Sequence, residues 1–491
     1  MPKKKDTSEE IVKKSPKIKK KVVEKTTGSQ VNKSVGKKSA NSGAGVEGKN
    51  TKISKPKYSL LRGMHDILPR EEKYQAPFLK IANDLAKHFR FKKIQTPVLE
   101  EANLFIRSIG RGTDVVDKEM YTFEDRDKKK VCLRPEMTAS VARAYMIHGL
   151  WNMTQPLKLW YWGPMFRHDR PQAGRYREFN QVGFEILGKA DPVIDAELIL
   201  LAYNFYNDLG MPVEVHINSI GTPEERERYK MALVEYYRSK RSYLCEDCRK
   251  RINKNPMRLL DCKQKQCQPI KEESPQIIEW LDSESKSHFV KVLEYMDELG
   301  IPYVLRHSLV RGLDYYTRTV FEIYPAIIEE TEGSDTESSL SKQEALGGGG
   351  RYDLLVEQMG GRPTPACGFS LGIERSVSFL RKCCEKEICK LEKQEFDVFV
   401  AQLGDQARRR ALKIIDEFRK SGIRVDFNLS KKSLKDQLDM ANSIQVPFAL
   451  ILGQKEVQDN TVIIRDMESG VQEIVDQKKV MGVLLKKIGK V

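Results

Sequence analysis

The sequence predicts an α+β fold built on antiparallel strands, with a middle segment of different character and a separate α/β domain near the C-terminal end. Residues 158–188 read as two long extended segments joined by a loop, which is typical of an antiparallel hairpin. A charged, helical segment that contains four cysteines runs from about Thr222 to Leu305, and strand-like and helix-like segments alternate from Phe396. A chain of 491 residues is expected to form two to four domains.

Hydrophobic periodicity predicts the individual elements. In chain order they are an amphipathic helix from Arg70 to His88, a strand ending at Pro97, helices at 131–148 and 191–210, a strand within 313–325, a polar surface loop at 329–344, and a strand turning into a helix at 366–376. From Phe396 the order is βαβα over about 95 residues, with one helix that ends at Lys420 and a second helix over 433–444. This order predicts largely parallel strand pairing in the last domain.

The positive charge is concentrated at the N-terminal end. Residues 1–57 hold 17 lysines against 5 acids, a net +12 of the total +16. This tail has no aromatic residue, so it cannot bury enough apolar area to offset its ordering entropy, and we expect it to be disordered. Two roles remain open for it, a solvated tail or a segment that binds RNA non-specifically through its lysines.

Several protein classes are excluded by composition. No run of 18 apolar residues occurs, so no membrane partner is expected. The tail lacks the apolar segment of a secretory signal, and it carries acids but no arginine, which argues against a transit peptide. The nine cysteines do not form the pattern of a disulfide scaffold. A cytoplasmic location is therefore expected.

The hairpin at 158–188 carries more charge than a structural hairpin needs. Alternation places Phe179, Gln181, Gly183 and Glu185 on one face of the second strand, with Val182, Phe184 and Ile186 on the other. The first strand puts Tyr161, Gly163, Met165 and Arg167 together. Polar groups beside glycines, which are expected to leave open space, indicate a bound polar ligand; the alternative is a solvated hairpin face.

Other segments add arginine and glycine. Arg311 and Asp314 stand beside Tyr315 and Tyr316, four glycines precede Arg351, and Gly368 and Gly372 precede Arg375. Arginine recognises phosphate oxygens bidentately, and glycine lets the backbone approach a ligand. No G-x-x-x-x-G-K-[ST] motif occurs, so together these segments predict a polyphosphate-nucleotide site without a P-loop.

Four cysteines stand at C-x2-C-x13-C-x4-C, namely Cys245, Cys248, Cys262 and Cys267. This spacing suits tetrahedral zinc, and ordinary buried thiols are the alternative. Cys383, Cys384 and Cys389 are expected to be ordinary thiols.

Long motifs resemble those of the histidyl-tRNA synthetase family, which belongs to the class II aminoacyl-tRNA synthetases. They are RGMHDILP (62–69), LRPEMTASVARAY (133–145), GPMFRHDRPQAGRYREFNQVGFE (163–185), RGLDYYTRTVFE (311–322), GGGGRYD (347–353) and GFSLGIER (368–375). The resemblance covers nearly everything from residue 58 to 491. It implies a catalytic domain at 58–221 and 306–390, an insertion at 222–305 and an anticodon-binding domain at 395–491, after the disordered lysine-rich tail that composition predicts at 1–57.

The resemblance also implies the reaction and its residues. ATP, with Mg²⁺, would activate L-histidine to histidyl-adenylate, and the histidyl group would pass to tRNA(His). Arg167 and Arg311 match the catalytic arginines at the α-phosphate, Arg175 and Arg375 match positions near the γ-phosphate, and Phe179 and Arg375 would enclose adenine. Glu136, Thr138 and Gln181 match residues around the α-amino group of histidine, and Glu185 and Tyr316, beside Tyr315, match those at the imidazole.

Two further expectations follow from the same resemblance. The family works as a homodimer, with the helix at 70–88 and the strand to Pro97 as the dimer element; alone, that helix could instead pack within its own chain. The alternative function is a non-catalytic regulatory or RNA-binding paralogue. The intact RGLDYYTRTVFE motif and the C-terminal α/β domain argue against it.

Overall fold

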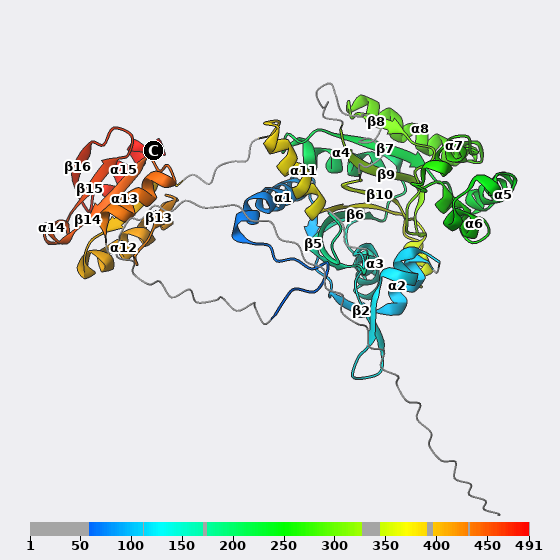
Figure 1. Ribbon diagram of the computed structural model, residues 1–491, viewed down its shortest axis with the longest axis horizontal. Helices are drawn as coiled ribbons and strands as arrows, with labels where there is room; N and C mark the ends of the chain where they lie inside the picture. The colour runs from blue at the N-terminus through cyan, green and yellow to red at the C-terminus, as the bar shows by residue number, and fades with distance from the viewer. Residues whose placement is uncertain are drawn as a thin grey trace, which may run out of the picture. The chain divides into compact units, whose positions relative to one another are not determined.

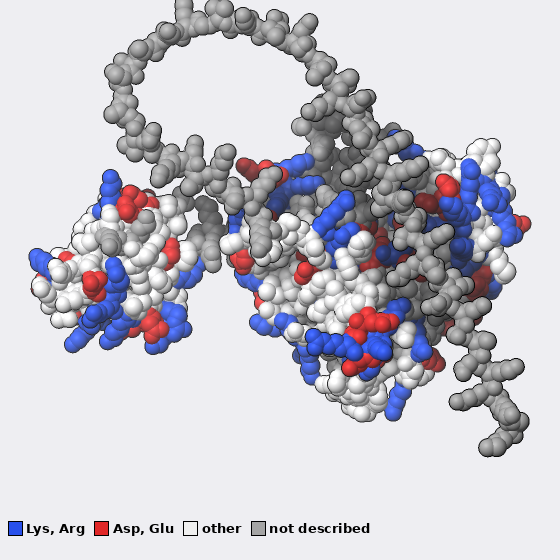
Figure 2. Space-filling view, turned by 60° about the horizontal axis from the view of Figure 1, so that its bottom comes forward, with Lys and Arg blue, Asp and Glu red and all other residues white. Residues whose placement is uncertain are grey.

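The computed structural model describes residues 58–110, 112–169, 174–326, 344–389, 396–430 and 433–490 (Figure 1). The tail expected at 1–57 lies outside these residues, and so does the expected loop at 329–344 apart from Glu344. Within the described part, no helix combines the length and apolar character that crossing a membrane requires. On the face shown in Figure 2, Lys and Arg side chains are interspersed with Asp and Glu.

The largest sheet is mainly antiparallel, as predicted. Its eight strands lie in the order β1-β5-β6-β11-β10-β9-β7-β8. Parallel pairing among its described strands occurs only at the two edges, between β1 and β5 and between β7 and β8. The bounds are β1 Lys92–Lys93, β5 Leu157–Phe166, β6 Glu178–Leu187, β7 Val213–Ser219, β8 Tyr303–Leu305, β9 Thr317–Pro325, β10 Gly347–Arg351 and β11 Ala366–Gly372. The predicted α+β fold class is confirmed.

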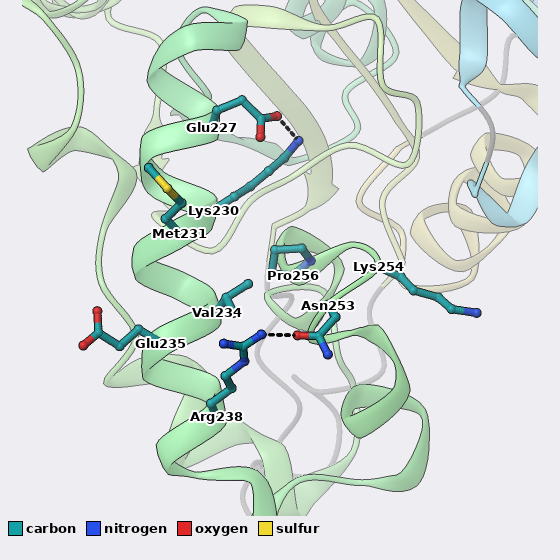
Figure 3. Close-up of a pocket in the computed structure, with 9 residues that line it drawn as sticks. All are labelled: Glu227, Lys230, Met231, Val234, Glu235, Arg238, Asn253, Lys254 and Pro256. Atoms are coloured by element: carbon teal, nitrogen blue, oxygen red, sulfur yellow. Dashed lines mark hydrogen bonds and ion pairs between the residues drawn. The ribbon is translucent and has the colours of Figure 1, made fainter.

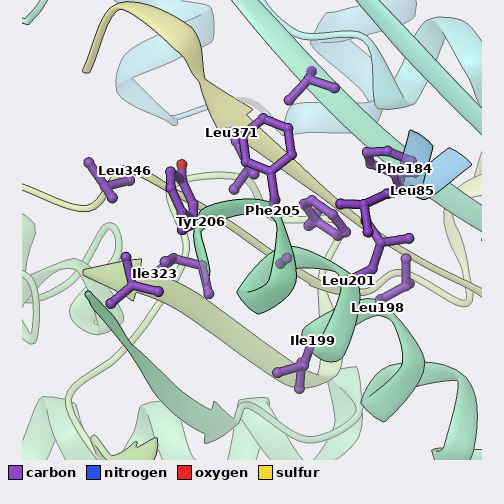
Figure 4. Close-up of a cluster of buried hydrophobic side chains, with 14 of the residues drawn as sticks. Leu85, Phe184, Leu198, Ile199, Leu201, Phe205, Tyr206, Ile323, Leu346 and Leu371 are labelled. Carbon is purple, nitrogen blue, oxygen red and sulfur yellow. The ribbon is translucent and has the colours of Figure 1, made fainter. Parts of the chain in front are cut away.

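One face of this sheet packs against long helices. These are α1 (Pro69–His88), α4 (Pro192–Asn207), α8 (Ser283–Glu298) and α11 (Ile373–Glu385). Figure 4 shows part of the shared core, where Leu85 of α1 and Phe205 of α4 are buried with Phe184 of β6 and Leu371 of β11. Each such side chain stabilises the fold by about 1.5–3 kcal/mol when fully buried. This core holds β6 and β11 rigidly, so residues on their opposite face have fixed positions.

The helix predicted at 131–148 is wrong in its first part. Residues Lys130–Leu133 form β4, which pairs with β2 (Leu99–Glu101) and β3 (Tyr121–Glu124) in a three-stranded sheet. Helix α3 covers only Thr138–Ile147. Pro135 explains the difference, because a residue that precedes proline is pushed away from helical angles. Short elements nearby are α2 (Ala102–Ile109), η1 (Val115–Glu119), η2 (Leu150–Asn152) and α10 (Leu355–Gln358).

The segment expected as an insertion has two parts. Its first part contains α5 (Pro223–Ser239), η3 (Arg241–Tyr243), α6 (Glu246–Arg251), η4 (Pro256–Leu259), η5 (Lys265–Cys267), α7 (Gln268–Glu272) and η6 (Ile277–Glu279). Its second part, α8 and β8, belongs to the main sheet: β8 pairs with β7, and Phe289 of α8 is part of the same hydrophobic core as Leu85 and Phe205. The material added to the sheet is therefore shorter than 222–305.

The C-terminal residues form a five-stranded sheet in the order β13-β12-β14-β15-β16. The elements are β12 Val398–Gln402, α12 Asp405–Lys420, β13 Val425–Phe427, α13 Leu434–Ser443, β14 Phe448–Leu452, α14 Gln454–Gln458, β15 Thr461–Asp466, β16 Gln472–Asp476 and α15 Val480–Lys487. The prediction of largely parallel pairing is wrong for the second half, since β14–β15 and β15–β16 are antiparallel. Their connections are too short for the crossover that parallel strands need.

Candidate active site

One cavity gathers the predicted site residues from distant parts of the chain. It has a volume of about 430 Å³ and lies against β6, β9, β10 and β11 on the face opposite the helical core. All but one of the eleven predicted site residues line it: Glu136, Thr138, Arg167, Arg175, Phe179, Gln181, Arg311, Tyr315, Tyr316 and Arg375. Glu185 is the exception.

Arg167 follows directly after β5 and is held from two sides. Its Nε donates to the Pro135 carbonyl at 2.8 Å, and its guanidinium carbon lies 5.5 Å from the centre of the Phe179 ring. Phe179 faces Met165 across the hairpin. The backbone amide of Arg167 donates to the Arg177 carbonyl. The hairpin register therefore fixes where this guanidinium enters the cavity; Arg170 lies outside the described residues.

Arg175 and Arg375 share one carboxylate. Arg175 lies 3.3 Å and Arg375 3.2 Å from the two oxygens of Glu344, and Arg175 also contacts Asp169 at 2.9 Å. Arg375 donates further to the Gly174 and Ala345 carbonyls. Burial lowers the pKa of Arg375 below its usual value, yet an arginine stays charged in proteins. Two guanidiniums thus meet at one end of the cavity, where carboxylates balance their charge.

Arg311 enters from the opposite wall. Its partner is Glu322 on β9, and its guanidinium carbon lies 5.5 Å from the centre of the Tyr316 ring. Arg311 thus pairs with Glu322 and not with Asp314, which stands three residues along in the same motif. A Cβ added at Gly348 would lie 2.8 Å from Nη1 of Arg311, so this glycine makes room for the guanidinium.

Three buried polar atoms of the cavity wall have no hydrogen-bond partner among the described residues. They are Oε1 of Gln181, Nε of Arg311 and Nε of Arg175. Leaving such a group unpaired costs about 1–3 kcal/mol. A bound polar ligand that supplied the missing partners would recover this free energy.

Glu136 and Thr138 lie where α3 begins. The Glu136 carboxylate accepts the backbone amides of Thr138 at 2.6 Å and Ala139 at 3.0 Å. Glu136 therefore caps the helix and lines the cavity at the same time. Burial raises the pKa of this carboxyl above its usual value, against the lowering effect of these amides.

Glu185 lies behind the cavity wall and is only 1% exposed. Its carboxylate accepts hydrogen bonds from Tyr352 at 2.6 Å, Thr138 at 2.8 Å and Tyr161 at 3.3 Å. Burial raises its pKa to about 8. The carboxylate is thus joined to the cavity through the Thr138 hydroxyl.

The glycines of the hairpin do not leave the open space that the sequence suggests. A Cβ at Gly183 would lie 2.2 Å from the Tyr161 ring, and one at Gly163 would lie 2.6 Å from the Arg134 guanidinium. Gly368 likewise faces Glu185, whose Oε2 would lie 1.6 Å from an added Cβ. These glycines accommodate buried side chains of the protein, and that part of the prediction is wrong. Period-two alternation identifies a face but not what fills it.

We expect Gly368→Ala to destabilise the sheet. The added methyl group must displace the Glu185 carboxylate, and overpacking of this kind costs about 1–3 kcal/mol. Gly372→Ala on the same strand is the control, because its Cβ would meet only the Leu346 carbonyl at 3.6 Å. All four tryptophans lie between Trp151 and Trp280, so urea unfolding followed by fluorescence reports on this part of the chain. Equal losses in both variants would contradict the expectation.

The pKa of Glu185 also predicts a pH dependence of stability. The folded pKa of about 8 lies above the ordinary value of 4.5, so the folded state binds more protons between these values. The free energy of unfolding should therefore fall as the pH rises from about 5 to 8. Glu185→Gln should flatten this slope when urea unfolding is followed by tryptophan fluorescence. Parallel pH curves for the two proteins would contradict the assignment.

Some cavity residues carried no sequence signal. Arg258 and Asp261 of the insertion and Asp114 near η1 line the cavity, and Arg258 donates to Asp114 at 2.8 Å. Despite burial, hydrogen bonds from Lys118 and Arg258 hold the pKa of Asp114 below its usual value. The sequence motifs of the site do not extend into the insertion, and only tertiary contact joins the two.

A larger hollow of about 660 Å³ lies along α5 (Figure 3). Its lining includes Lys230 and Glu227, which pair with each other, and none of the predicted site residues. The four predicted cysteine ligands lie elsewhere in the same segment, with their sulfur atoms all within 4.8 Å of one another.

The antiparallel sheet, its hairpin and the arginine-lined cavity define the catalytic fold of a class II aminoacyl-tRNA synthetase. A sequence profile described as histidyl-tRNA synthetase matches residues 63–223 and 251–375, and one described as anticodon binding domain matches 397–487. The chain belongs to the histidyl-tRNA synthetase family.

Individual relatives agree with this. A histidine–tRNA ligase of Dehalococcoides mccartyi is 42% identical over 419 residues, covering 85% of this chain and 97% of the relative. One from Aquifex aeolicus is 43% identical over 416 residues, covering 84% and 98%. The crystal structure of the apo histidyl-tRNA synthetase of Staphylococcus aureus superimposes with a TM-score of 0.69 at 33% identity, covering 87% of this chain and 99% of that one.

Proposed function

We propose that this protein attaches L-histidine to tRNA(His) in two steps, through a histidyl-adenylate formed from ATP. The observation that carries the proposal is the cavity, where arginines from the hairpin, from 311 and from 375 converge beside Glu136, Gln181 and two tyrosines. Family membership supports the same reaction.

In the first step ATP lies along the arginines. Arg167 and Arg311 bind the α-phosphate from opposite sides, while Arg175 and Arg375 bind near the γ-phosphate. Phe179 and Arg375 enclose adenine. Attack of the histidine carboxylate on the α-phosphorus forms the mixed anhydride and releases pyrophosphate, and fixed guanidiniums stabilise the negative charge that develops on the phosphate oxygens.

Entry of the triphosphate changes the pairing of the arginines. In the ligand-free protein Arg175 and Arg375 contact Glu344, and Arg311 contacts Glu322. Mg²⁺ accompanies the nucleotide, since this ion binds through phosphate oxygens and one or two carboxylates and keeps several waters. The acidic side chains of the wall, Glu322 among them, are available to it.

Histidine occupies the end of the cavity near Thr138. Glu136, Thr138 and Gln181 bind its α-amino group, and the unpaired Oε1 of Gln181 supports this assignment. Tyr316, beside Tyr315, and Glu185 bind the two imidazole nitrogens, one on each side. The Glu185 carboxylate is joined to this end of the cavity by the hydrogen bond that it accepts from the Thr138 hydroxyl.

The alternative is a non-catalytic paralogue that keeps the fold. ATP–pyrophosphate exchange measured with each of the twenty amino acids separates the two. We expect exchange with histidine alone, and the same exchange from protein that lacks residues 1–57. Absence of exchange with histidine in folded, full-length protein would overturn the proposed function.

We further propose that the protein works as a cytoplasmic homodimer. The side chains of Leu68, Leu79 and Leu99, which lie on or near α1 and β2, are more than one-third exposed. These exposed apolar side chains are available for contact with a second chain. Sedimentation at micromolar concentration should give twice the mass of one chain, and a monomer there would contradict the proposed homodimer.

The domain at 397–487 is proposed to bind the anticodon of tRNA(His).

A further inference from the structure

The four cysteines of the insertion come together although they are separated in the sequence. Cys245 precedes α6, Cys248 lies within it, and Cys262 and Cys267 follow η4. The Sγ atoms of Cys245 and Cys262 are 3.9 Å apart, and all four sulfurs lie within 4.8 Å of one another. A tetrahedron with Zn–S bonds of about 2.3 Å has its sulfurs about 3.8 Å apart. The arrangement needs little adjustment to enclose one metal ion.

The surroundings suit a metal bound by four thiolates, which has a net charge of −2. Between residues 245 and 267 the chain carries seven basic and three acidic side chains. The backbone amide of Cys245 donates to the sulfur of Cys267 at 3.3 Å. Contacts of this kind orient thiolate ligands and spread their charge. Tetrahedral sets of four sulfurs bind zinc or iron in proteins, whereas Mg²⁺, Ca²⁺ and Mn²⁺ prefer oxygen ligands.

The segment between the second and third cysteines reaches the active-site cavity. Within it Arg258 donates to Asp114 at 2.8 Å, and both Arg258 and Asp261 line the cavity. The other side of the segment is tied to α5, where Arg238 donates to Asn253 at 2.9 Å (Figure 3). It contains only the one-turn η4 and the end of α6 as regular structure, so it depends on fixed ends to hold Arg258 in place.

We propose that Cys245, Cys248, Cys262 and Cys267 bind one structural zinc ion, and that this ion fixes the segment 249–261 so that Arg258 stays at the cavity wall. The zinc takes no part in the chemistry. Arg258 acts as a positioning residue through Asp114.

Two other states of the four cysteines compete with zinc. A disulfide needs sulfurs about 2.05 Å apart, and all four cysteines are free thiols. Buried cysteines can also serve as small apolar side chains. The chain contains an internal control for this second state, because Cys383 is fully buried and has no such four-sulfur set among the described residues.

Metal content of the full-length protein, purified under reducing conditions and given Zn²⁺ before dialysis, tests the site directly. We expect about one zinc per chain, loss of it in Cys262→Ser, and full retention in Cys383→Ser. Replacement by Co²⁺ should give the absorption bands of tetrahedral thiolate coordination. A wild-type protein that holds no zinc, or a Cys262→Ser variant that keeps it, would overturn the site.

Hydrogen exchange tests separately whether the zinc site fixes the segment 249–261. We expect the amides of 249–261 to exchange faster in Cys262→Ser than in wild type, and at the wild-type rate in Cys383→Ser. Unchanged exchange of these amides in a zinc-free variant would refute the role of zinc in fixing segment 249–261. The result on zinc binding would still stand.

A last measurement rests on the proposed function. Cys262→Ser should lose about tenfold in histidine-dependent exchange, and Arg258→Ala, which keeps its zinc, should lose a similar factor. Wild-type rates in either variant would refute the positioning role. If the wild-type protein itself shows no exchange, the proposed function fails, whereas the zinc and hydrogen-exchange results still stand.

Discussion

Arg311→Ala is expected to lower the rate of histidine-dependent ATP–pyrophosphate exchange about 10²–10³-fold. The substitution removes a buried guanidinium from one side of the proposed α-phosphate position and leaves Arg167 alone on the other. It also leaves Glu322 without its cationic partner, so an uncompensated negative charge remains where the phosphate must bind. The loss should appear mainly in kcat, because the interaction strengthens as charge develops in the transition state.

Two further variants make this test specific. Arg306→Ala removes an exposed arginine five residues earlier in the chain and should leave the exchange rate unchanged. Arg311→Lys keeps the charge but not the planar fork, and an intermediate rate is expected. If folded Arg311→Ala forms adenylate at near the wild-type rate, the proposal that Arg311 stabilises charge at the α-phosphate is wrong.

The second large effect concerns histidine recognition. We expect Glu185→Gln to lower kcat/KM for histidine about 10- to 100-fold when measured above the folded Glu185 pKa of about 8, where the carboxylate is ionised, because a hydrogen bond to a charged group contributes about 1.5–3 kcal/mol. The amide keeps the shape of the carboxylate but accepts hydrogen bonds on one atom only, so it cannot serve all three hydroxyl donors and the imidazole. Exchange kinetics at varied histidine concentration, with ATP saturating, measure the change.

Tyr352→Phe provides the matched control for Glu185. It removes the 2.6 Å hydrogen bond to the carboxylate but leaves the carboxylate itself, so its effect on kcat/KM for histidine should be smaller. An unchanged kcat/KM for histidine in Glu185→Gln would assign Glu185 to the packing of the sheet alone. A change in the KM for ATP but not for histidine would equally contradict the proposed role of Glu185 in binding histidine.

Much of the site could be predicted because its residues lie in continuous motifs. Arg167, Phe179 and Gln181 fall on one face of the hairpin by alternation, and the pairing of β5 with β6 brings the two strands' shares of that face together. Membership of the histidyl-tRNA synthetase family, predicted from the same motifs, is confirmed. The assigned roles of the individual residues stay predictions until the variants are measured.

Other features could not be predicted from local pattern. Arg258 enters the cavity from the insertion, and no periodicity relates it to Asp114, which lies 144 positions away. The Tyr161 side chain fills the space beside Gly183, and the Glu185 side chain fills the space beside Gly368. Which side chain fills such a space depends on the rotamers that the packed sheet allows. The antiparallel pairs β14–β15 and β15–β16 were missed because strand-like and helix-like segments alternate there, although α14 is too short for a crossover.

The sequence by itself determined the family, the residue types of the site and the kind of most of the long elements, because periodicity and motifs are local properties of the chain. Only the tertiary structure decided that guanidiniums from three distant segments face one another, that Glu185 lies behind the wall and that four cysteines converge. These facts depend on side-chain packing across the sheet, where buried groups must find partners and fill volume together.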